Sequence, residues 1–418
     1  IGERRFDEAL RLHRERNPFV AICARVCFHP CEGKCRRSTL DESLSIRSLK
    51  RYMADQEKTF QLPAMYGDGK NAKRKVAIVG AGPAGLSCAY FLARLGYKPT
   101  VYEAESEPGG MLVQAIPAYR LPRDELRREI GAIQKLGVDI KLKKRLGRDF
   151  TLTSLREKGA EAVFLAVGAP KGTGLGLKGE DAKNVVEAIE YLRTYNLTGN
   201  APKGKQVVVV GGGNAAVDAA RTALRLGAKT VTVVYRRTRS AMPAYAEEVE
   251  EAEREGVRFE FLAAPLSLDV KGGALVGATF RRMELGEFDK SGRRRPVAKA
   301  GAEFTLAADL LIAAIGHRPL WTMNMAAGIS AKAIVIARFR MAIAPLPSIR
   351  YPASIWNATA RRIRFQCKGN AIRTWGFSWL QYTKGKTTPQ GAFRAAGVIS
   401  RKASGTLRSL PSRALLLE

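Results

Sequence analysis

Acidic residues are missing from the last quarter of this 418-residue sequence. There is no Asp or Glu between Asp309 and Glu418, and residues 319–418 carry 16 Lys and Arg. All four tryptophans also lie in this stretch, so its composition differs from that of residues 1–318. Because the run is too long for ordinary compositional scatter, it favours a frameshift in the gene or its assembly. A replaced, basic C-terminal module is the alternative.

Long apolar runs are also missing. No run of about 18 uncharged apolar residues occurs and no signal peptide opens the chain, so we expect a cytoplasmic protein without a membrane partner. An apolar content of 46% excludes disorder throughout the chain. The net charge of +31 would suggest nucleic acid as a partner. Half of that excess lies in residues 319–418 and no nucleic-acid motif accompanies it, so nucleic acid is not expected.

Cysteine is scarce outside one short segment. Four of the six cysteines form C-x3-C-x3-C-x3-C at Cys23, Cys27, Cys31 and Cys35. Without a secretion signal, such a cluster indicates metal binding rather than disulfides. Thiolates suit zinc and iron–sulfur clusters, and this even spacing differs from the paired spacing of zinc ribbons. The pattern therefore favours an iron–sulfur cluster, with zinc and unliganded thiols as the alternatives.

A first glycine-rich turn follows the apolar residues 76–79. Gly80, Gly82 and Gly85 form G-x-G-x-x-G before a predicted helix over 86–95, and Glu103 ends the next predicted strand. The glycines allow a tight turn, the approach of a pyrophosphate, and close packing of helix on strand. The helix N-terminus attracts phosphates, and a carboxylate at position 103 can bind ribose hydroxyls. This unit predicts a dinucleotide site, but the motif alone does not separate FAD from NAD.

A second unit contains the turn G-G-G-N-A-A. Gly211, Gly213 and Ala216 lie between a predicted strand over 206–210 and a predicted helix over 215–226. The strand over 230–235 is followed by Arg236 and Arg237 rather than by an acid. Guanidinium groups bind a 2′-phosphate that a carboxylate would repel, which favours NADPH over NADH. The alternative is that both arginines lie in a solvated loop.

The fold class predicted from these units is α/β, with two Rossmann-like dinucleotide-binding domains, for FAD and NADPH, and an N-terminal helical iron–sulfur domain. Buried strands over 162–167 and 310–315 are the predicted crossing points between the two. The predicted boundaries are 1–62 for the cysteine-rich domain, 76–170 for the first part of the FAD domain, 171–309 for the inserted NADPH domain, 310–318 for the return to the FAD domain, and 319–418 for the basic tail.

The motifs together resemble those of the glutamate synthase small (beta) subunit family and of the N-terminal half of dihydropyrimidine dehydrogenase. The resemblance rests on N-P-F-V-A-I-C-A-R-V-C-F-H-P-C-E-G-K-C-R-R, V-G-A-G-P-A-G-L, I-P-A-Y-R-L-P, G-G-G-N-A-A-V-D-A-A-R, Y-R-R and A-A-I-G, and it ends near Arg318. It implies an electron relay from NADPH through FAD to 4Fe-4S clusters and a large catalytic partner subunit. Another acceptor, such as ferredoxin, a formate dehydrogenase or a hydrogenase, is the alternative, as is an inactive truncated product.

The resemblance also assigns residues to the cofactors. Those on the FAD side are Gly82, Pro83, Ala84, Glu103, Gly110, Met111, Arg120 and Leu146. Those on the nicotinamide side are Gly212, Gly213, Asn214, Ala215, Arg236, Arg237, Ala314 and Gly316. Hydride transfer depends on stacking, so no catalytic side chain is predicted. Asp218 is predicted to be a packing or capping group, and Glu247, Glu248, Glu250 and Glu251 a solvated helix face.

The chain departs from the family in two respects. The family shares its four cysteines between two clusters whose other ligands lie upstream, and this chain starts too late to contain them. The family also has a late F-A-G-G-D-like segment that binds the flavin, and nothing after Arg318 matches it.

Overall fold

The computed structural model describes residues 1–57, 65–67, 69–289 and 292–318. The predicted basic tail (319–418) and the end of the predicted cysteine-rich domain lie outside the described residues. Within the part that is described, no helix is long and apolar enough to cross a membrane.

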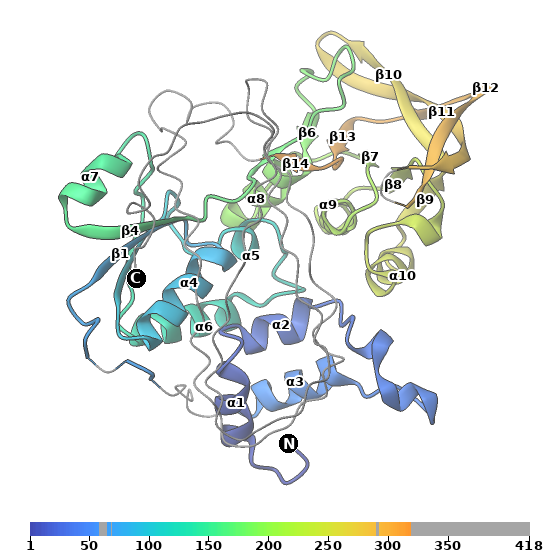
Figure 1. Ribbon diagram of the computed structural model, residues 1–418. Coiled ribbons are helices and arrows are strands. Elements are labelled where there is room, and N and C mark those ends of the chain that lie inside the picture. Colours follow the sequence, from blue (N-terminus) through green and yellow to red (C-terminus); the bar gives the residue numbers. More distant parts are fainter. Residues whose placement is uncertain (58–64, 68, 290–291, 319–418) are drawn as a thin grey trace, which may run out of the picture. The chain divides into compact units, whose positions relative to one another are not determined.

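Three short helices form the N-terminal part of the chain (Figure 1): α1 (Phe6–Arg14), α2 (Val20–Val26) and α3 (Ile46–Asp55). Leu10, Val20 and Met53 pack together in a small core of their own. The segment between α2 and α3 holds the later cysteines and two 3-10 turns, Glu32–Lys34 and Arg36–Thr39. The apolar spacing of these helices therefore buries one face of each.

The first sheet is parallel, with strand order β3-β2-β1-β4. Its strands are β1 (Lys75–Val79), β2 (Lys98–Tyr102), β3 (Asp139–Lys141) and β4 (Ala160–Leu165). The helices of this part are α4 (Pro83–Arg94), α5 (Met111–Gln114), α6 (Arg123–Lys135) and α7 (Leu152–Glu157). Since β1 is buried on both faces, it reads as a continuous apolar run rather than an alternating one.

Side-chain alternation along β1 divides its residues between two cores. Val76 and Ile78 pack in the core that contains residues of α4 and α6, and Ile22 of α2 belongs to the same core. Ala77 and Val79 face the other way, against Phe150 and Leu155. The N-terminal helices therefore share a hydrophobic core with the first sheet.

The second sheet is also parallel, with order β6-β13-β7-β8-β9. Its strands are β6 (Val185–Glu187), β7 (Gln206–Val210), β8 (Thr230–Tyr235), β9 (Arg258–Phe261) and β13 (Leu310–Ala313). Its helices are α8 (Ala188–Thr198), α9 (Asn214–Arg225) and α10 (Ala246–Arg254), and a 3-10 turn spans Arg239–Ala241.

The position of β13 corrects one predicted boundary. Residues 310–318 were predicted to return to the FAD domain, but Leu310–Ala313 pair with β7 and β6 inside the second sheet. The strand fits there because both of its faces are buried. Ile312 packs in the core on the helix side of the second sheet, and Leu311 packs in the core on its other side. The chain leaves this sheet only afterwards, where β14 (His317–Arg318) pairs antiparallel with β5 (Lys171–Gly172).

An antiparallel sheet covers the second face of the second sheet. It consists of β10 (Ala263–Lys271), β11 (Ala274–Phe288) and β12 (Arg294–Ala307), in that order (Figure 1). Phe280 and Leu275 pack with Val208 and Val210 of β7, whereas Val207 and Val209 face the helices. The four successive valines of β7 are thus buried on both faces, as expected of a central parallel strand.

Candidate functional site

The first glycine turn joins β1 to α4 through a backbone that only glycine adopts easily. Gly80 has φ of +105°, and a Cβ atom built there would lie 2.4 Å from the carbonyl oxygen of Ala166. On α4, a Cβ atom at Gly85 would lie 1.9 Å from the carbonyl oxygen of Gly80. Both positions therefore exclude a side chain for reasons within the protein.

Gly82 differs, because no contact with the described residues requires a glycine there. Its φ of −75° and ψ of −178° suit any residue. A Cβ atom would meet only the Cα of Gly110, at 3.9 Å. The predicted FAD residues Pro83 and Ala84, in the first turn of α4, are exposed, and no side chain caps that helix. Among the described residues, the N–H groups at the start of α4 thus have no side-chain partner, as expected of a helix start that receives a phosphate.

Glu103 lies directly beside this turn. Its Oε2 accepts a hydrogen bond of 2.7 Å from the N–H of Ala81, and its Oε1 accepts one of 2.9 Å from the N–H of Glu105. The side chain is 7% exposed. The structure therefore brings the predicted ribose-binding carboxylate to the glycine turn and fixes its direction.

The other predicted FAD residues fall into two groups. Gly110 touches the turn, since a Cβ atom there would lie 2.8 Å from the Cα of Gly82, and Met111 follows it as the first residue of α5. Leu146 packs in the core beneath β1. The N–H of Lys144, two residues before it, donates to the carbonyl of Glu103 over 2.7 Å. These contacts place both segments next to the turn or to Glu103.

Arg120 binds the second Rossmann-like unit instead of the turn. Its Nη1 donates to both carboxylate oxygens of Asp218 on α9, at 2.9 and 2.7 Å, and its Nε lies 2.8 Å from a carboxylate oxygen of Glu248. Burial raises the pKa of Asp218 to about 6, although Arg120 lowers it. Asp218 is thus a buried ion-pair partner, in agreement with a packing role.

Glu248 does not belong to a solvated helix face. Its side chain is 21% exposed and lies between Arg120 and Arg221, with a hydrogen bond of 2.7 Å from Arg221. The prediction for this glutamate was wrong, because the arginines that bury it come from segments distant in the sequence. Glu250 and Glu251, by contrast, keep roughly half-exposed side chains.

The second glycine turn repeats the geometry of the first. Gly211 has φ of +149°, and a Cβ atom there would lie 2.3 Å from the carbonyl oxygen of Ala314. At Gly212, a Cβ atom would meet the ring of Tyr235 at 2.4 Å. Gly213 again has an ordinary φ of −92°, and a Cβ atom there would meet no atom of the described residues within 4 Å. The turn therefore leaves the same open place before α9.

The start of α9 is held by its own residues. The side-chain oxygen of Asn214 accepts a 3.0 Å hydrogen bond from the N–H of Tyr245. Ala216 is fully buried against the sheet and Ala215 partly so, which explains the small residues there. Gly316 lies further along, where its carbonyl accepts from the N–H of Thr173 over 3.0 Å. The structure thus gathers Asn214, Ala215, Ala216 and Ala314 at the turn.

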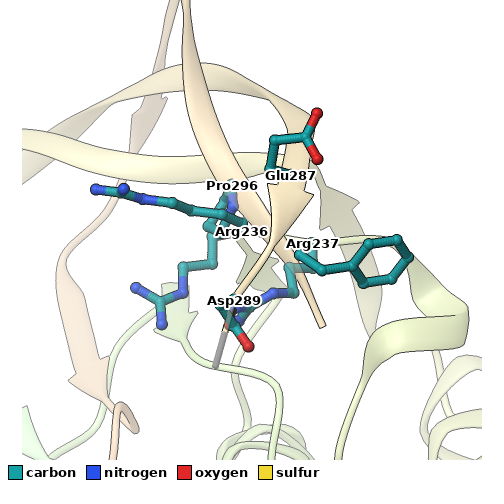
Figure 2. Close-up of a pocket in the computed structure, with 7 residues that line it drawn as sticks. Arg236, Arg237, Glu287, Asp289 and Pro296 are labelled. Atoms are coloured by element: carbon teal, nitrogen blue, oxygen red, sulfur yellow. Dashed lines mark hydrogen bonds and ion pairs between the residues drawn. The ribbon is translucent and has the colours of Figure 1, made fainter. Parts of the chain in front are cut away.

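The two arginines after β8 have different environments. Arg236 is exposed, whereas Arg237 is 4% exposed and donates to Asp289 (2.9 Å) and to the carbonyl of Arg294 (3.0 Å). Both line a pocket of about 620 Å³ with residues of β11 and β12 (Figure 2). The pocket lies at the carboxyl end of β8, where the sequence predicted the 2′-phosphate.

The four cysteines carry free thiols along the segment from α2 to Cys35. Burial raises the pKa of the Cys23 thiol, whereas the backbone N–H of Leu44, followed by that of Arg37, lowers the pKa of Cys35. The donor set fits an iron–sulfur cluster in its chemistry, since thiolates are its ligands. Among the described residues, however, no three Cys, His, Asp or Glu side chains are gathered as for a metal ion.

This cysteine segment contacts α10 and the residue before it. Arg47 donates to Glu247 (2.8 Å) and to the carbonyl of Cys27 (3.2 Å), and the ring of Phe28 stacks on Tyr245 at 5.0 Å. His29 lies 3.1 Å from Glu247. Phe28 and His29, which follow Cys27, therefore lie beside the segment whose Tyr245 is bound by Asn214 of the second turn.

Two family matches cover most of the described chain. Residues 74–338 match the pyridine nucleotide-disulphide oxidoreductase family. The chain belongs to this family. Residues 1–62 match the dihydropyrimidine dehydrogenase domain II, 4Fe-4S cluster, family. The predicted fold class, family and cofactor classes (FAD, NADPH and a 4Fe-4S cluster) are thereby confirmed. The match extends to residue 338, beyond Arg318, where the resemblance was predicted to end.

Named relatives extend this picture. The chain is 45% identical over 342 residues to the NADP(+)-dependent formate dehydrogenase subunit beta of Moorella thermoacetica, covering 76% of this chain and 48% of that protein. It is 40% identical over 335 residues to the glutamate synthase (NADPH) small chain of Escherichia coli strain K12, covering 76% and 70%. The chain thus spans about half the length of the first relative and more of the second.

The fold also occurs in a solved structure. Mycobacterium tuberculosis FprA in complex with NADPH superposes with a TM-score of 0.53 and 20% sequence identity, over 59% of this chain and 71% of FprA. At that identity the similarity shows the fold alone. The roles of individual residues in binding stay predictions.

Proposed function

We propose that this chain is the NADPH-oxidising part of an electron-transfer complex. It binds FAD at the first glycine turn, NADPH at the second, and a 4Fe-4S cluster through Cys23, Cys27, Cys31 and Cys35. Each NADPH that is oxidised to NADP⁺ and a proton yields two electrons, which leave through the cluster to an acceptor. Bound flavin supplies the conversion, because it takes electrons in pairs and gives them up singly.

The observation that carries this proposal is the pair Gly82 and Gly213. Neither glycine is required by its backbone angles, and neither is required by a contact with the part of the chain that the structure describes. Both precede a helix whose first N–H groups have no side-chain cap. A phosphate that approaches the backbone is a physical reason for leaving out a side chain at such a position.

The residues of the chain act by position rather than by proton transfer. Glu103 orients toward the first turn, and Asn214 holds the segment at Tyr245 against the start of α9. Hydride transfer requires stacking at the right distance, so no side chain is proposed as a catalytic acid or base. The chain's contribution is therefore to fix the positions of two nucleotides.

The first experiment is an anaerobic absorbance spectrum of the purified full chain before and after NADPH is added. Flavin bands that NADPH bleaches are the expected result, with a broad shoulder near ~400 nm from the cluster. The variants G82A and G213A separate the two sites. We expect G82A to fold and lose flavin, whereas G213A keeps flavin that NADPH no longer bleaches.

Two results would overturn the proposal. A chain that carries neither flavin nor iron would be the inactive product that the unusual composition of residues 319–418 suggested as an alternative. Variants G82A and G213A that both behave like the wild-type chain would show that the open places beside the two turns do not hold phosphates.

The acceptor that we propose first is a large glutamate synthase subunit, because the chain covers 70% of a glutamate synthase small chain. A second candidate is an acceptor of another kind, which the 45% identity to a formate dehydrogenase subunit favours. Co-purification separates these candidates. Glutamate formed from glutamine and 2-oxoglutarate with NADPH supports the first, and formate-dependent reduction of NADP⁺ supports the second.

A further inference from the structure

The guanidinium group of Arg237 forms hydrogen bonds with other groups of the protein. Its guanidinium is buried and donates to Asp289 at the end of the β11–β12 hairpin and to the carbonyl of Arg294. Asp289 in turn accepts from the N–H of Arg293 over 3.2 Å. Arg237 therefore fixes the hairpin to the carboxyl end of β8, and a nucleotide phosphate would have to displace Asp289 from a partly buried ion pair to reach the Arg237 guanidinium.

Two other arginines line the same pocket without a partner. Arg236 comes from the loop after β8 and Arg295 from β12. The guanidinium group of neither residue makes a hydrogen bond or ion pair within the described part of the chain. Glu287 is the remaining charged group of the lining and also has no partner there. Since Arg237 and Asp289 neutralise each other, the pocket keeps an excess of positive charge (Figure 2). Two guanidinium groups in one pocket repel each other, and an anion that binds there offsets this repulsion.

A β-bulge directs Arg295 toward the pocket. Leu285 pairs with Pro296 and Phe288 with Arg294, so Gly286 and Glu287 together oppose the single residue Arg295. Bulges of this kind occur beside functional sites, where they change the direction of a side chain. The neighbouring Arg294 does not line the pocket, and its guanidinium instead donates to the carbonyls of Leu285 and Gly286 within the hairpin.

We propose that Arg295, together with Arg236, binds the 2′-phosphate of NADPH, and that Arg237 holds in place the hairpin that carries Arg295. The proposal rests on the function proposed above, since it assigns a specificity-determining residue to that nucleotide site. A phosphate monoester dianion matches two guanidinium groups that line one pocket, here one from the loop after β8 and one from β12. The sequence motif after β8 pointed to Arg236 and Arg237, so Arg295 replaces the second of these.

The test uses the full chain and two small probes, 2′,5′-ADP and 5′-AMP, measured by calorimetry. We expect R295Q to weaken 2′,5′-ADP binding about 10- to 100-fold, as for the loss of hydrogen bonds to a charged group, and to leave 5′-AMP binding unchanged. R295K should recover part of the affinity, because it keeps the charge but not the paired donors. K299Q removes one charge from an exposed position of the same strand outside the pocket and should change neither probe.

The outcomes separate this inference from the proposed function. If the wild-type chain is bleached by NADPH and R295Q binds 2′,5′-ADP as tightly as the wild-type chain does, the inference is wrong and the function stands. A loss of both probes in R295Q would assign Arg295 a structural role and also overturn it. If the wild-type chain binds neither probe and NADPH bleaches no flavin, the proposed function itself fails.

Discussion

At the scale of single residues, the two turns use glycine for different physical needs. Gly80 and Gly211 adopt positive φ angles against the carbonyl oxygens of Ala166 and Ala314. Substitutions there strain the fold whether or not a cofactor is bound. Gly82 is not constrained in this way by the described residues, so a side chain there should hinder a bound ligand without straining the fold. Stability and cofactor binding are therefore separable at neighbouring positions of one motif.

Glu103 links the turn to the cofactor that we propose for it. Its carboxylate accepts from the N–H groups of Ala81 and Glu105, which would be left without partners in E103A. We expect this variant to lose about 1–3 kcal/mol of unfolding free energy and to lose flavin on gel filtration. E105Q, which alters a more exposed carboxylate nearby, should keep its flavin. Flavin retained in full by E103A would contradict the proposed role.

Glu129 of α6 gives the folded chain a pH dependence. It is fully buried, and its two oxygens accept from the N–H groups of Ala21 and Ile22 at the start of α2. Burial raises the pKa of Glu129 from 4.5 to about 7. Between these values the folded chain holds a proton that the unfolded chain has released. Its unfolding free energy therefore falls as pH rises, by at most about 1.4 kcal/mol per pH unit.

The variant E129Q tests this expectation, since glutamine does not titrate. Urea unfolding followed by circular dichroism at pH 5, 6, 7 and 8 should show the wild-type chain losing stability relative to E129Q up to about pH 7, and no further change above it. D124N, which alters a fully exposed carboxylate on the same helix, should follow the wild-type curve. Parallel curves for E129Q and the wild-type chain would be the contrary result.

Residues that depend on distant partners were the ones that the sequence could not place. The strand, turn and helix around each G-x-G motif are local, so their spacing predicted them. The burial of Arg237 depends on Asp289, and the partial burial of Glu248 depends on Arg120, each far away in the chain. Charge runs look solvated in a sequence because the opposite charge that buries them is contributed by another segment.

At the scale of elements, β13 shows what an apolar run can and cannot predict. The run over 310–315 predicted a buried strand, and the structure has one at Leu310–Ala313. Its neighbours were not predictable from the run, because any strand buried on both faces has the same composition. The antiparallel sheet of β10, β11 and β12 was not predicted at all, although it supplies the hairpin that closes the Arg236 pocket.

The place of β13 between β6 and β7, with both faces buried, makes this strand sensitive to the shortening of its side chains. Ile312 is 0% exposed, whereas Ile315, three residues later, is 45% exposed. We expect I312A to lower the unfolding free energy by about 2–5 kcal/mol through the cavity that it leaves. The matched variant I315A should stay within about 0.5 kcal/mol of the wild-type chain. Equal losses in urea unfolding would place the strand elsewhere.

At the scale of the whole molecule, the cysteine segment is attached to both Rossmann-like units. Phe19 and Ile22 of the N-terminal part share a core with β1 and α4. Arg47 and Phe28 contact Glu247 and Tyr245 beside α10. Such attachment would keep a cluster within the same body as both nucleotides, so electrons would not need a separate docking step between the flavin and the cluster.

The variant C31S tests how far the cofactors depend on one another. Cys31 is exposed, so serine should leave the fold unchanged while removing one of the proposed thiolate ligands. Under anaerobic conditions we expect C31S to lose iron and acid-labile sulfide and yet to keep flavin that NADPH bleaches. C88A serves as the control, because Cys88 lies on α4 outside the cysteine segment. The C88A variant should keep its iron.

Electron delivery supplies the second readout for C31S. If the cluster is the exit, the variant should reduce a one-electron acceptor such as ferredoxin far more slowly than the wild-type chain, while flavin bleaching by NADPH stays fast. Full iron content in C31S would remove Cys31 from the ligand set. Loss of flavin together with iron would mean that the cluster supports the flavin site through the core that Ile22 shares with β1. The pattern of the two losses thus distinguishes a relay of independent sites from a single cooperative cofactor body.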